Sequence, residues 1–232
     1  MSSLLSILAL GTLAGMGHSL EADHVAAVSS IVAGDRNRGS AASHGLSWGI
    51  GHTLTLLLVS VCALILGQSI SPGFERRFEL VVGFMLVALG LNLVWRMHRQ
   101  KMHFHGHVHG GERPHFHGHS HRDEAVDHRR SPHRHIHRLR PRALFVGMIH
   151  GLAGSAALLV VTATQLHSWQ SGLLYVVLFG TGSILGMTLL SLAIALPLRL
   201  AGRWLTAVGG ALQMGLACLT IFIGSSVVLE YW

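Results

Sequence analysis

Six long apolar stretches constrain this chain more than any other feature of its sequence. They cover roughly residues 3–33, 42–67, 78–97, 143–165, 170–198 and 203–229. A helix that crosses a bilayer needs about 20 mainly apolar residues, whereas a transmembrane strand shows about ten residues of alternating character. None of the six stretches alternates, and a backbone in lipid must satisfy its own hydrogen bonds. We therefore expect an all-α membrane protein with six transmembrane helices.

Basic residues are concentrated on one side of this expected topology. Alternate loops are assigned to opposite sides of the membrane. Fifteen of the seventeen lysines and arginines then lie on the same side as the long central loop, and only Arg76 and Arg77 lie on the other side. Lysine and arginine mark the cytoplasmic face of a membrane protein. We therefore expect a bacterial cytoplasmic (inner) membrane protein with both termini outside and the long loop inside. The positive charge follows the membrane topology, so we expect a lipid bilayer and no nucleic acid as partner.

The two halves of the sequence are weakly similar to each other. GMGHSLEADHVAAV from Gly15 corresponds to GMIHGLAGSAALLV from Gly147, at an offset of 132 residues. WGIGHTL from Trp48 corresponds to FGTGSIL from Phe179, at an offset of 131 residues. Chance similarity among small and apolar residues is the alternative, but the order of the spans is kept, which favours duplication.

A repeat of three spans has to be inverted in the membrane, because three is an odd number. Inverted repeats are a recurring transporter architecture, with the substrate site near the bilayer midplane. We interpret residues 1–97 and 143–232 as two inverted three-helix repeats. Residues 98–142 form a histidine-rich cytoplasmic loop between them, which we expect to be disordered because it is polar and charged. Gly-x-x-x-Gly pairs, which let helices approach closely in lipid, occur at Gly11/Gly15, Gly45/Gly49, Gly147/Gly151 and Gly182/Gly186.

Four ionisable side chains lie close together in the first apolar stretch. The segment HSLEADH supplies His18, Glu21, Asp23 and His24, and residue 18 is the centre of the stretch. An aspartate at that depth costs about 2.5–3.5 kcal/mol on insertion scales, so such groups indicate function. Imidazole and carboxylate ligands together suit transition metals, whereas Mg²⁺ and Ca²⁺ prefer oxygen ligands. We therefore predict a site for a divalent transition metal; hydrogen bonds between helices, or a hydrated cavity without a ligand, are the alternatives.

One regular helix cannot direct these side chains at a single ion. His18 and Asp23 are about 140° apart around a helix, and His24 lies about 9 Å further along the axis than His18. We therefore predict a local distortion around residues 15–24, with further ligands from neighbouring helices. These candidates are His44, His52 and His150.

The second repeat lacks most of these groups. His150 corresponds to His18, but Ser155, Ala156 and Ser183 stand where the first repeat has Asp23, His24 and His52. We therefore expect one asymmetric metal site. Other residues in the spans receive weaker assignments: packed thiols for Cys62 and Cys218, apolar packing for Met16 and Met148, and indirect support of the site for Asn92, Thr162, Thr164 and Gln165.

The motif around the candidate ligands resembles a known family. His18-x4-Asp23-His24 in a transmembrane helix is similar to the signature of the nickel/cobalt transporter (NiCoT) family, and the GHT around His52 resembles its Gly-His-Ser/Thr segment. The whole chain looks like the shorter six-span relatives, which include urease-accessory-type nickel permeases. The resemblance implies that four residues take part in the selection or passage of Ni²⁺ or Co²⁺ as transported substrate: His18, Asp23, His24 and His52. The longer members carry extra spans and acidic motifs that are absent here.

The central loop is rich in a second set of potential ligands. Thirteen of the nineteen histidines lie between His98 and His137. The auxiliary candidates are His103, His105, His107, His109, His115, His117, His119 and His121. Neutral imidazoles bind borderline metals, and their affinity falls as the pH drops through a pKa of about 6.5. We expect the loop to capture, buffer or sense metal, with a cytoplasmic metallochaperone as a candidate partner; a solvated linker is the alternative.

Several functional classes stay open. HSLEADH favours uptake, whereas a cytoplasmic histidine-rich loop also resembles bacterial nickel/cobalt efflux proteins, and zinc efflux is a further alternative. A cation diffusion facilitator normally ends in a soluble metal-binding domain, and a ZIP-type transporter carries His-Asn and His-Glu pairs that this sequence lacks. A membrane chaperone or sensor would bind metal without moving it. A haem cytochrome would need an axial pair such as His44 and His150. The oligomeric state is open.

The sequence contains no signature of an enzyme. A glycine-rich phosphate loop with lysine is absent, as are hydrolase and nucleophile motifs. We therefore expect no enzymatic activity and no catalytic cofactor. Transport would then proceed by a secondary mechanism rather than by ATP hydrolysis in this chain.

Overall fold

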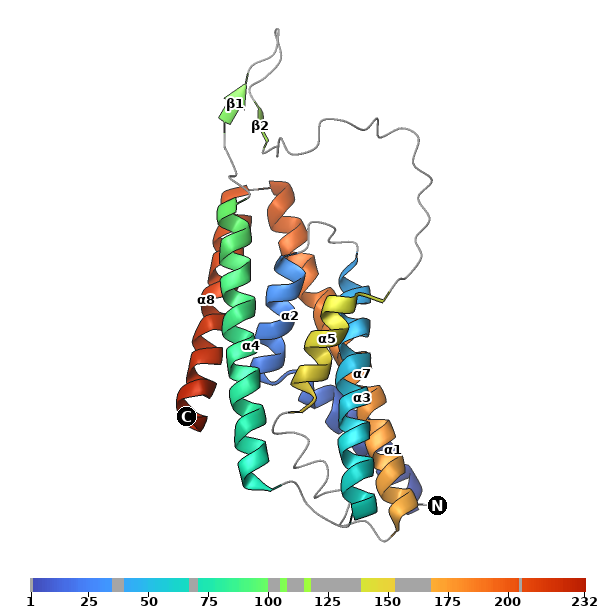
Figure 1. Cartoon of the computed structure of the whole chain (residues 1–232). Coiled ribbons are helices and arrows are strands. Elements are labelled where there is room, and N and C mark those ends of the chain that lie inside the picture. Colours follow the sequence, from blue (N-terminus) through green and yellow to red (C-terminus); the bar gives the residue numbers. More distant parts are fainter. Residues whose placement is uncertain are drawn as a thin grey trace.

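The computed structural model describes residues 2–34, 40–66, 71–99, 105–107, 115–117, 139–152, 168–204 and 206–232. These residues form seven helices and one pair of short strands (Figure 1). The elements are α1 (Ser2–His18), α2 (Ala22–Ala33), α3 (Ala41–Leu66), α4 (Pro72–Arg99), β1 (His105–His107), β2 (His115–His117), α5 (Pro141–His150), α7 (Trp169–Trp204) and α8 (Thr206–Tyr231).

Four helices of the described chain are long and apolar enough to cross a membrane. Their apolar parts are Ala41–Ala63 in α3, Pro72–Arg99 in α4, Trp169–Leu198 in α7 and Gly209–Tyr231 in α8. These helices confirm an all-α integral membrane protein. The first predicted span is divided between α1 and α2, and the fourth begins as α5 and continues into residues 153–167, outside the described residues. The arrangement as six spans therefore stays a prediction.

The helix α4 begins earlier than the apolar pattern indicates. It starts at Pro72 rather than near residue 78, because the charged first turns continue the helix beyond its apolar part. Arg76 in this segment donates hydrogen bonds to the carbonyl oxygens of Tyr231 and Trp232 at the end of α8. Long basic side chains at a helix end can reach polar partners in this way. The charged turns thus join the ends of α4 and α8.

The first apolar stretch is interrupted at residues 19–21, which confirms the predicted distortion. Two glycines, Gly15 and Gly17, precede the break and weaken the last turns of α1. The hydroxyl of Ser19 donates to the carbonyl oxygen of Met16 over 2.7 Å, which satisfies one of the last carbonyls of α1. Glu21 then adopts an extended conformation as the residue before α2. The break changes the direction of the chain just after His18.

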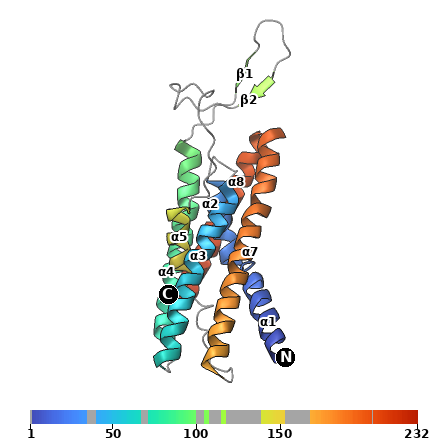
Figure 2. The ribbon, with the colours of Figure 1, turned by 90° about the vertical axis from the view of Figure 1, so that its right-hand side faces the viewer.

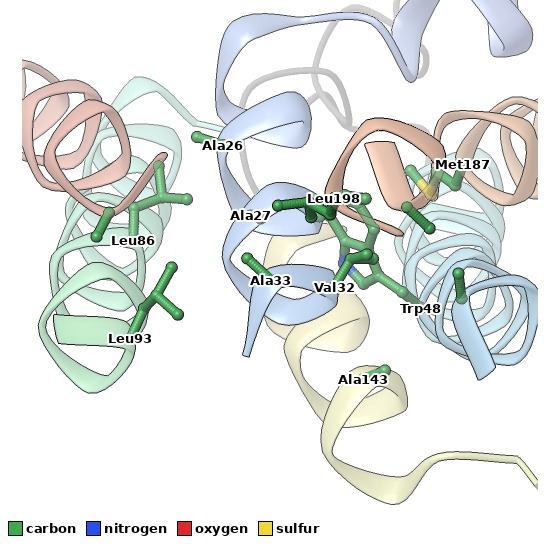
Figure 3. Close-up of a cluster of buried hydrophobic side chains, with 14 of the residues drawn as sticks. Ala26, Ala27, Val32, Ala33, Trp48, Leu86, Leu93, Ala143, Met187 and Leu198 are labelled. Carbon is green, nitrogen blue, oxygen red and sulfur yellow. The ribbon is translucent and has the colours of Figure 1, made fainter. Parts of the chain in front are cut away.

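The short helix α2 is the centre of the bundle. It contacts α3, α4, α7 and α8, and its side chains are small and mostly buried. Ser30 donates to Thr220 of α8 over 2.9 Å, and Thr220 donates to the carbonyl oxygen of Ala26 over 3.1 Å. Figure 3 shows the apolar side chains around this helix, with Leu86 and Leu93 of α4 on one side and the side chains of α3 and α7 on the other.

The remaining helices pack in pairs around α2. The closest pairs are α4 with α8, α3 with α7, α1 with α7 and α3 with α5. In Figure 1, α4 and α8 lie together on one side of α2, while α1, α3, α5 and α7 lie together on the other; Figure 2 shows this second group, with α3 and α7 between α5 and α1. Both groups contact α2, directly or through a neighbour.

Glycines at equivalent positions of the two sequence halves make equivalent contacts. A Cβ atom at any of four glycines would collide with the carbonyl oxygen of a neighbouring helix, so the absence of a side chain permits the approach. These contacts join Gly15 to Phe179, Gly147 to Trp48, Gly182 to Thr12 and Gly51 to Leu144. The pair Gly15–Phe179 corresponds to the pair Gly147–Trp48, and the pair Gly182–Thr12 corresponds to Gly51–Leu144. Corresponding residues are 131 or 132 positions apart in the sequence. The α1–α7 and α3–α5 interfaces are thus related by the same correspondence as the sequence halves.

Two details differ from the sequence-based expectations. The strands β1 and β2 pair in antiparallel register inside the histidine-rich segment, which we expected to lack regular structure. Cys62 and Cys218 are free thiols, as expected, but both are exposed on the outside of the bundle. The prediction that they are packed inside was wrong, because an apolar span offers a lipid-facing surface as well as a packed one.

Candidate metal centre

Four histidines converge at the break between α1 and α2. His18 ends α1, His24 lies in the first turn of α2, His52 lies in α3 and His150 ends α5. All four are buried, with at most 5% of each residue exposed. The ring centroids of His18 and His24 are 4.3 Å apart, and those of His24 and His150 are 4.2 Å apart. Side chains that are distant in the sequence thus form one cluster.

Three of these histidines form a triad of potential metal ligands. One ring nitrogen from each of His18, His24 and His52 lies within 4.8 Å of the other two. The Nε2 atoms of His18 and His24 and both ring nitrogens of His52 have no hydrogen-bond partner among the described residues. A buried polar atom without a partner costs about 1–3 kcal/mol. A cation bound by all three rings would remove this cost.

Asp23 connects the cluster to α5 by hydrogen bonds. The Nδ1–H of His24 donates to one carboxylate oxygen over 2.9 Å, and the Nε2–H of His150 donates to the other over 2.8 Å. Asp23, His24 and His150 also form a second group with potential ligand atoms within 4.8 Å of one another. Since Nδ1 of His24 bonds to Asp23, its Nε2 is the ring nitrogen without a hydrogen-bond partner among the described residues. A carboxylate that orients a histidine in this way raises its basicity as a ligand.

The ends of two helices add a favourable electrostatic field. Both α1 and α5 terminate at a histidine of the cluster, so the negative ends of their dipoles point toward it. The carboxylate of Asp23 supplies a full negative charge at the same place. This field favours a cation and disfavours an anion, although the N-terminus of α2 opposes it in part.

Two aromatic side chains lie next to different histidines of the cluster, and we did not predict this role for them. The ring of Trp48 lies 5.5 Å from both His24 and His150, and the ring of Phe179 lies 5.3 Å from His18. Trp48 precedes His52 by one helical turn, so their i, i+4 spacing was the available signal. Phe179 corresponds to Trp48 in the sequence repeat, which was a second signal.

The other predicted ligands have different positions. Glu21 lies in the turn with an exposed side chain, and its Oε1 is 2.9 Å from Nδ1 of His18. Within the described residues His44 belongs to neither group; it lies two turns before His52 and lines cavities nearer the start of α3.

The structure describes only some of the remaining candidates. Asn92 lines a cavity near the end of α4, whereas Thr162, Thr164 and Gln165 lie outside the described residues. Of the auxiliary loop histidines, His105, His107, His115 and His117 belong to β1 and β2. His103, His109, His119 and His121 lie outside the described residues.

The fold and this site define an integral membrane protein with a buried histidine–carboxylate cluster at a broken helix. The chain is similar to the urease accessory protein UreH of Bacillus sp. (strain TB-90), with 35% identity over 200 residues that cover 86% of this chain and 81% of the relative. The chain belongs to the family of this urease accessory protein. That relationship confirms the resemblance to urease-accessory-type relatives. No family model matches the chain, and no solved structure matches it.

Proposed function

We propose that this protein transports Ni²⁺ or Co²⁺ across the bacterial inner membrane, in the direction of uptake and by a secondary mechanism. The observation that carries the proposal is the buried triad of His18, His24 and His52, whose ring nitrogens lack partners in the described part of the chain. Imidazole suits nickel and cobalt well. The relationship to a urease accessory protein supports nickel as cargo, since the sequence also resembles nickel permeases of that type.

The two groups of ligands suggest two neighbouring stations for the ion. The first contains His24 with His18 and His52, and the second contains His24 with Asp23 and His150. We propose that Nε2 of His24 belongs to the first station and Nδ1, which faces Asp23, to the second. In our proposal His24 belongs to both stations, so the ion passes from one nitrogen of its ring to the other. At the second station the ion replaces the two hydrogen bonds that Asp23 accepts.

We further propose six spans in two inverted repeats, with Trp48 and Phe179 as the gates. The equivalent glycine contacts of α1–α7 and α3–α5 support this arrangement. Trp48 lies on the side of the cluster toward the start of α3, and Phe179 lies on the side toward the start of α7. Because these helices run in opposite directions, the two rings separate the cluster from opposite membrane faces. Their covering of the histidines corresponds to an occluded state.

The histidine-rich segment would collect metal at the cytoplasmic end of this pathway. Its basic residues support a cytoplasmic position by the positive-inside rule. In this role the segment raises the local metal concentration but provides no part of the membrane site, and a metallochaperone would exchange metal with it.

Flux of radiolabelled nickel into proteoliposomes tests the proposal. His52→Ala removes a ligand of the first triad, so we expect the flux to fall by roughly tenfold or more. His44→Ala removes a histidine from the same helix outside both groups and should retain most of the flux. Deletion of residues 103–137 should lower the flux at low nickel concentration and leave it unchanged at saturation. Normal flux in correctly folded His52→Ala would contradict the proposed site.

A membrane metal binder that does not translocate is the second candidate. The complete burial of His24 and His52 favours it, because an enclosed site also suits permanent storage or sensing. Stoichiometric nickel binding without any flux would support this candidate and exclude transport. Preferential nickel accumulation in inside-out vesicles, with none in right-side-out vesicles, would instead support efflux.

A further inference from the structure

A cavity outside the cluster of His18, His24, His52 and His150 lies between α2, α4 and α5, at the ends of these helices nearest the histidine-rich segment, and His44 of α3 also lines it. Its volume is about 460 Å³. Three arginines line it: Arg96 in the last turn of α4, and Arg140 and Arg142 at the start of α5. Leu89 and Leu93 of α4 and Val146 of α5 line it further along the helices.

The charge of this cavity is unsuited to a cation. No carboxylate lines it among the described residues. The described carboxylates lie elsewhere: Glu21 and Asp23 at the helix break, and Glu75, Glu79 and Glu230 at the opposite ends of α4 and α8. Arg96 and Arg140 are half-buried, and a positive charge that is partly removed from water needs a compensating partner. The cavity therefore favours an anion.

One of the three arginines also has a structural task. The Nη1 atom of Arg96 donates to the carbonyl oxygen of Gly34 over 2.9 Å, at the C-terminal end of α2. The guanidinium groups of Arg140 and Arg142 form no hydrogen bond to any described residue. Both flank the N-terminus of α5, where the positive end of the helix dipole adds to their charge.

The cavity changes from basic to apolar along the membrane normal. Arg96 and Leu89 are seven residues apart on α4, which corresponds to about 10 Å along the helix axis. Leu89, Leu93 and Arg96 follow each other at i, i+4 and i+7, so they share one face of α4. The charged end lies at the helix termini and the apolar part lies deeper in the span. An amphipathic anion matches this order, whereas a small inorganic anion would use only the charged end.

We propose that this cavity binds the phosphate headgroup of an anionic phospholipid, such as phosphatidylglycerol, from the leaflet on the side of the histidine-rich segment. The headgroup phosphate pairs with Arg140 and Arg142, and an acyl chain lies along Leu89, Leu93 and Val146. Basic pockets between transmembrane helices bind lipid headgroups on the cytoplasmic side in this way. No residue of the two groups of candidate metal ligands lines this site, and its occupation neutralises the basic rim.

Native mass spectrometry of the detergent-solubilised full chain, titrated without metal, tests this assignment. The probes are short-chain phosphatidylglycerol, phosphatidylcholine with the same acyl chains, and glycerol phosphate. The variant Arg140→Gln/Arg142→Gln removes two charges from the cavity. Arg77→Gln/Arg99→Gln removes two charges outside its lining, where the guanidinium of Arg99 stacks on Trp95 and that of Arg77 on Phe74.

We expect wild type and the control variant to bind one phosphatidylglycerol more tightly than phosphatidylcholine. The Arg140→Gln/Arg142→Gln variant should bind it roughly tenfold or more weakly, since each basic side chain contributes to headgroup attraction. Unfolding temperatures of the two variants should match, which separates loss of the site from loss of the fold. Equal phosphatidylglycerol binding by all three proteins would overturn the proposal. Glycerol phosphate binding as tightly as the lipid would overturn the assignment to a lipid.

Discussion

At the residue scale, Asp23 organises the site by accepting hydrogen bonds from two histidines at once. His24 is its neighbour in sequence, whereas His150 is 127 residues away. Each carboxylate oxygen serves one ring, so the orientations of both imidazoles depend on a single side chain. The ring of His24 is thereby held with Nδ1 on Asp23, while its Nε2 has no hydrogen-bond partner among the described residues. A change in Asp23 should disturb both groups of ligands.

Asp23→Asn tests this role. The amide keeps the shape of the side chain, but it offers one acceptor oxygen and its NH₂ group cannot accept from the second histidine. We expect nickel affinity to fall by roughly 10–100-fold, as for other groups that orient metal ligands. Titration of the purified protein with nickel measures the effect.

The matched control for Asp23→Asn is Glu21→Gln, which alters a carboxylate with an exposed side chain two residues away. It should have a much smaller effect on affinity. Equal losses for the two variants would mean that negative charge at the break matters and that the hydrogen bonds of Asp23 do not.

The side chains that come together at the helix break could be named from the sequence as candidate ligands, but their grouping could not be predicted. Two histidines and two carboxylates inside an apolar stretch are too costly to be incidental, which is why His18, Asp23 and His24 could be named. The contact between Asp23 and His150 depends on how α5 packs against α3, which no local pattern encodes. His44 and His52 look equally suitable in sequence, yet only the tertiary packing separates them.

At the element scale, the decisive feature is the division of one apolar stretch into α1 and α2. Glycines allow this division and also allow α1 to approach α7. A Cβ atom on Gly15 would collide with the carbonyl oxygen of Phe179, whereas one on Gly17 would meet no atom within 4 Å. The two glycines are close in the sequence but differ in what surrounds them.

Gly15→Ala and Gly17→Ala form a matched pair for this difference. The added methyl of Gly15→Ala forces α1 away from α7, and we expect a loss of about 1–3 kcal/mol in the free energy of unfolding, as for other overpacked sites. Gly17→Ala should leave stability unchanged or slightly higher, because alanine favours a helix. Thermal unfolding in detergent measures both. A larger loss for Gly17→Ala would contradict the described α1–α7 contact.

The helix break could be anticipated because one straight helix cannot direct His18 and His24 at one point. The end of α5 at His150, inside the fourth apolar stretch, could not be anticipated in the same way. Its local sequence near His150 has fewer polar residues, and the end of α5 at that histidine follows from its contacts with α3. The early start of α4 could not be predicted from the apolar pattern either, because charged turns extend the helix beyond that pattern.

At the scale of the whole molecule, Trp48 and Phe179 correspond to each other in the sequence repeat and lie next to different histidines of one cluster. If these rings are gates, opening either one should expose the cluster to one membrane face only. A reporter cysteine at Ser183, which is buried beside α1, provides a probe without altering a proposed ligand. The two natural cysteines, Cys62 and Cys218, would be replaced by alanine first.

We expect Phe179→Ala to accelerate labelling of Ser183→Cys by a membrane-impermeant thiol reagent several-fold in whole cells. Trp48→Ala should instead accelerate labelling in inside-out vesicles. The reason is that each substitution removes the ring that covers one end of the cluster. Acceleration from both sides by either variant would show that the rings only fill space.

The central claim is that a transition-metal ion binds among the histidines at the break in the first apolar stretch. An anomalous difference map at the nickel absorption edge, from crystals of the protein soaked with Ni²⁺, measures this directly. We expect a peak within bonding distance of ring nitrogens of His18, His24 and His52, or of the neighbouring group of Asp23, His24 and His150. A map in which the protein-bound nickel lies elsewhere, with Asp23 still accepting from both histidines, would contradict it.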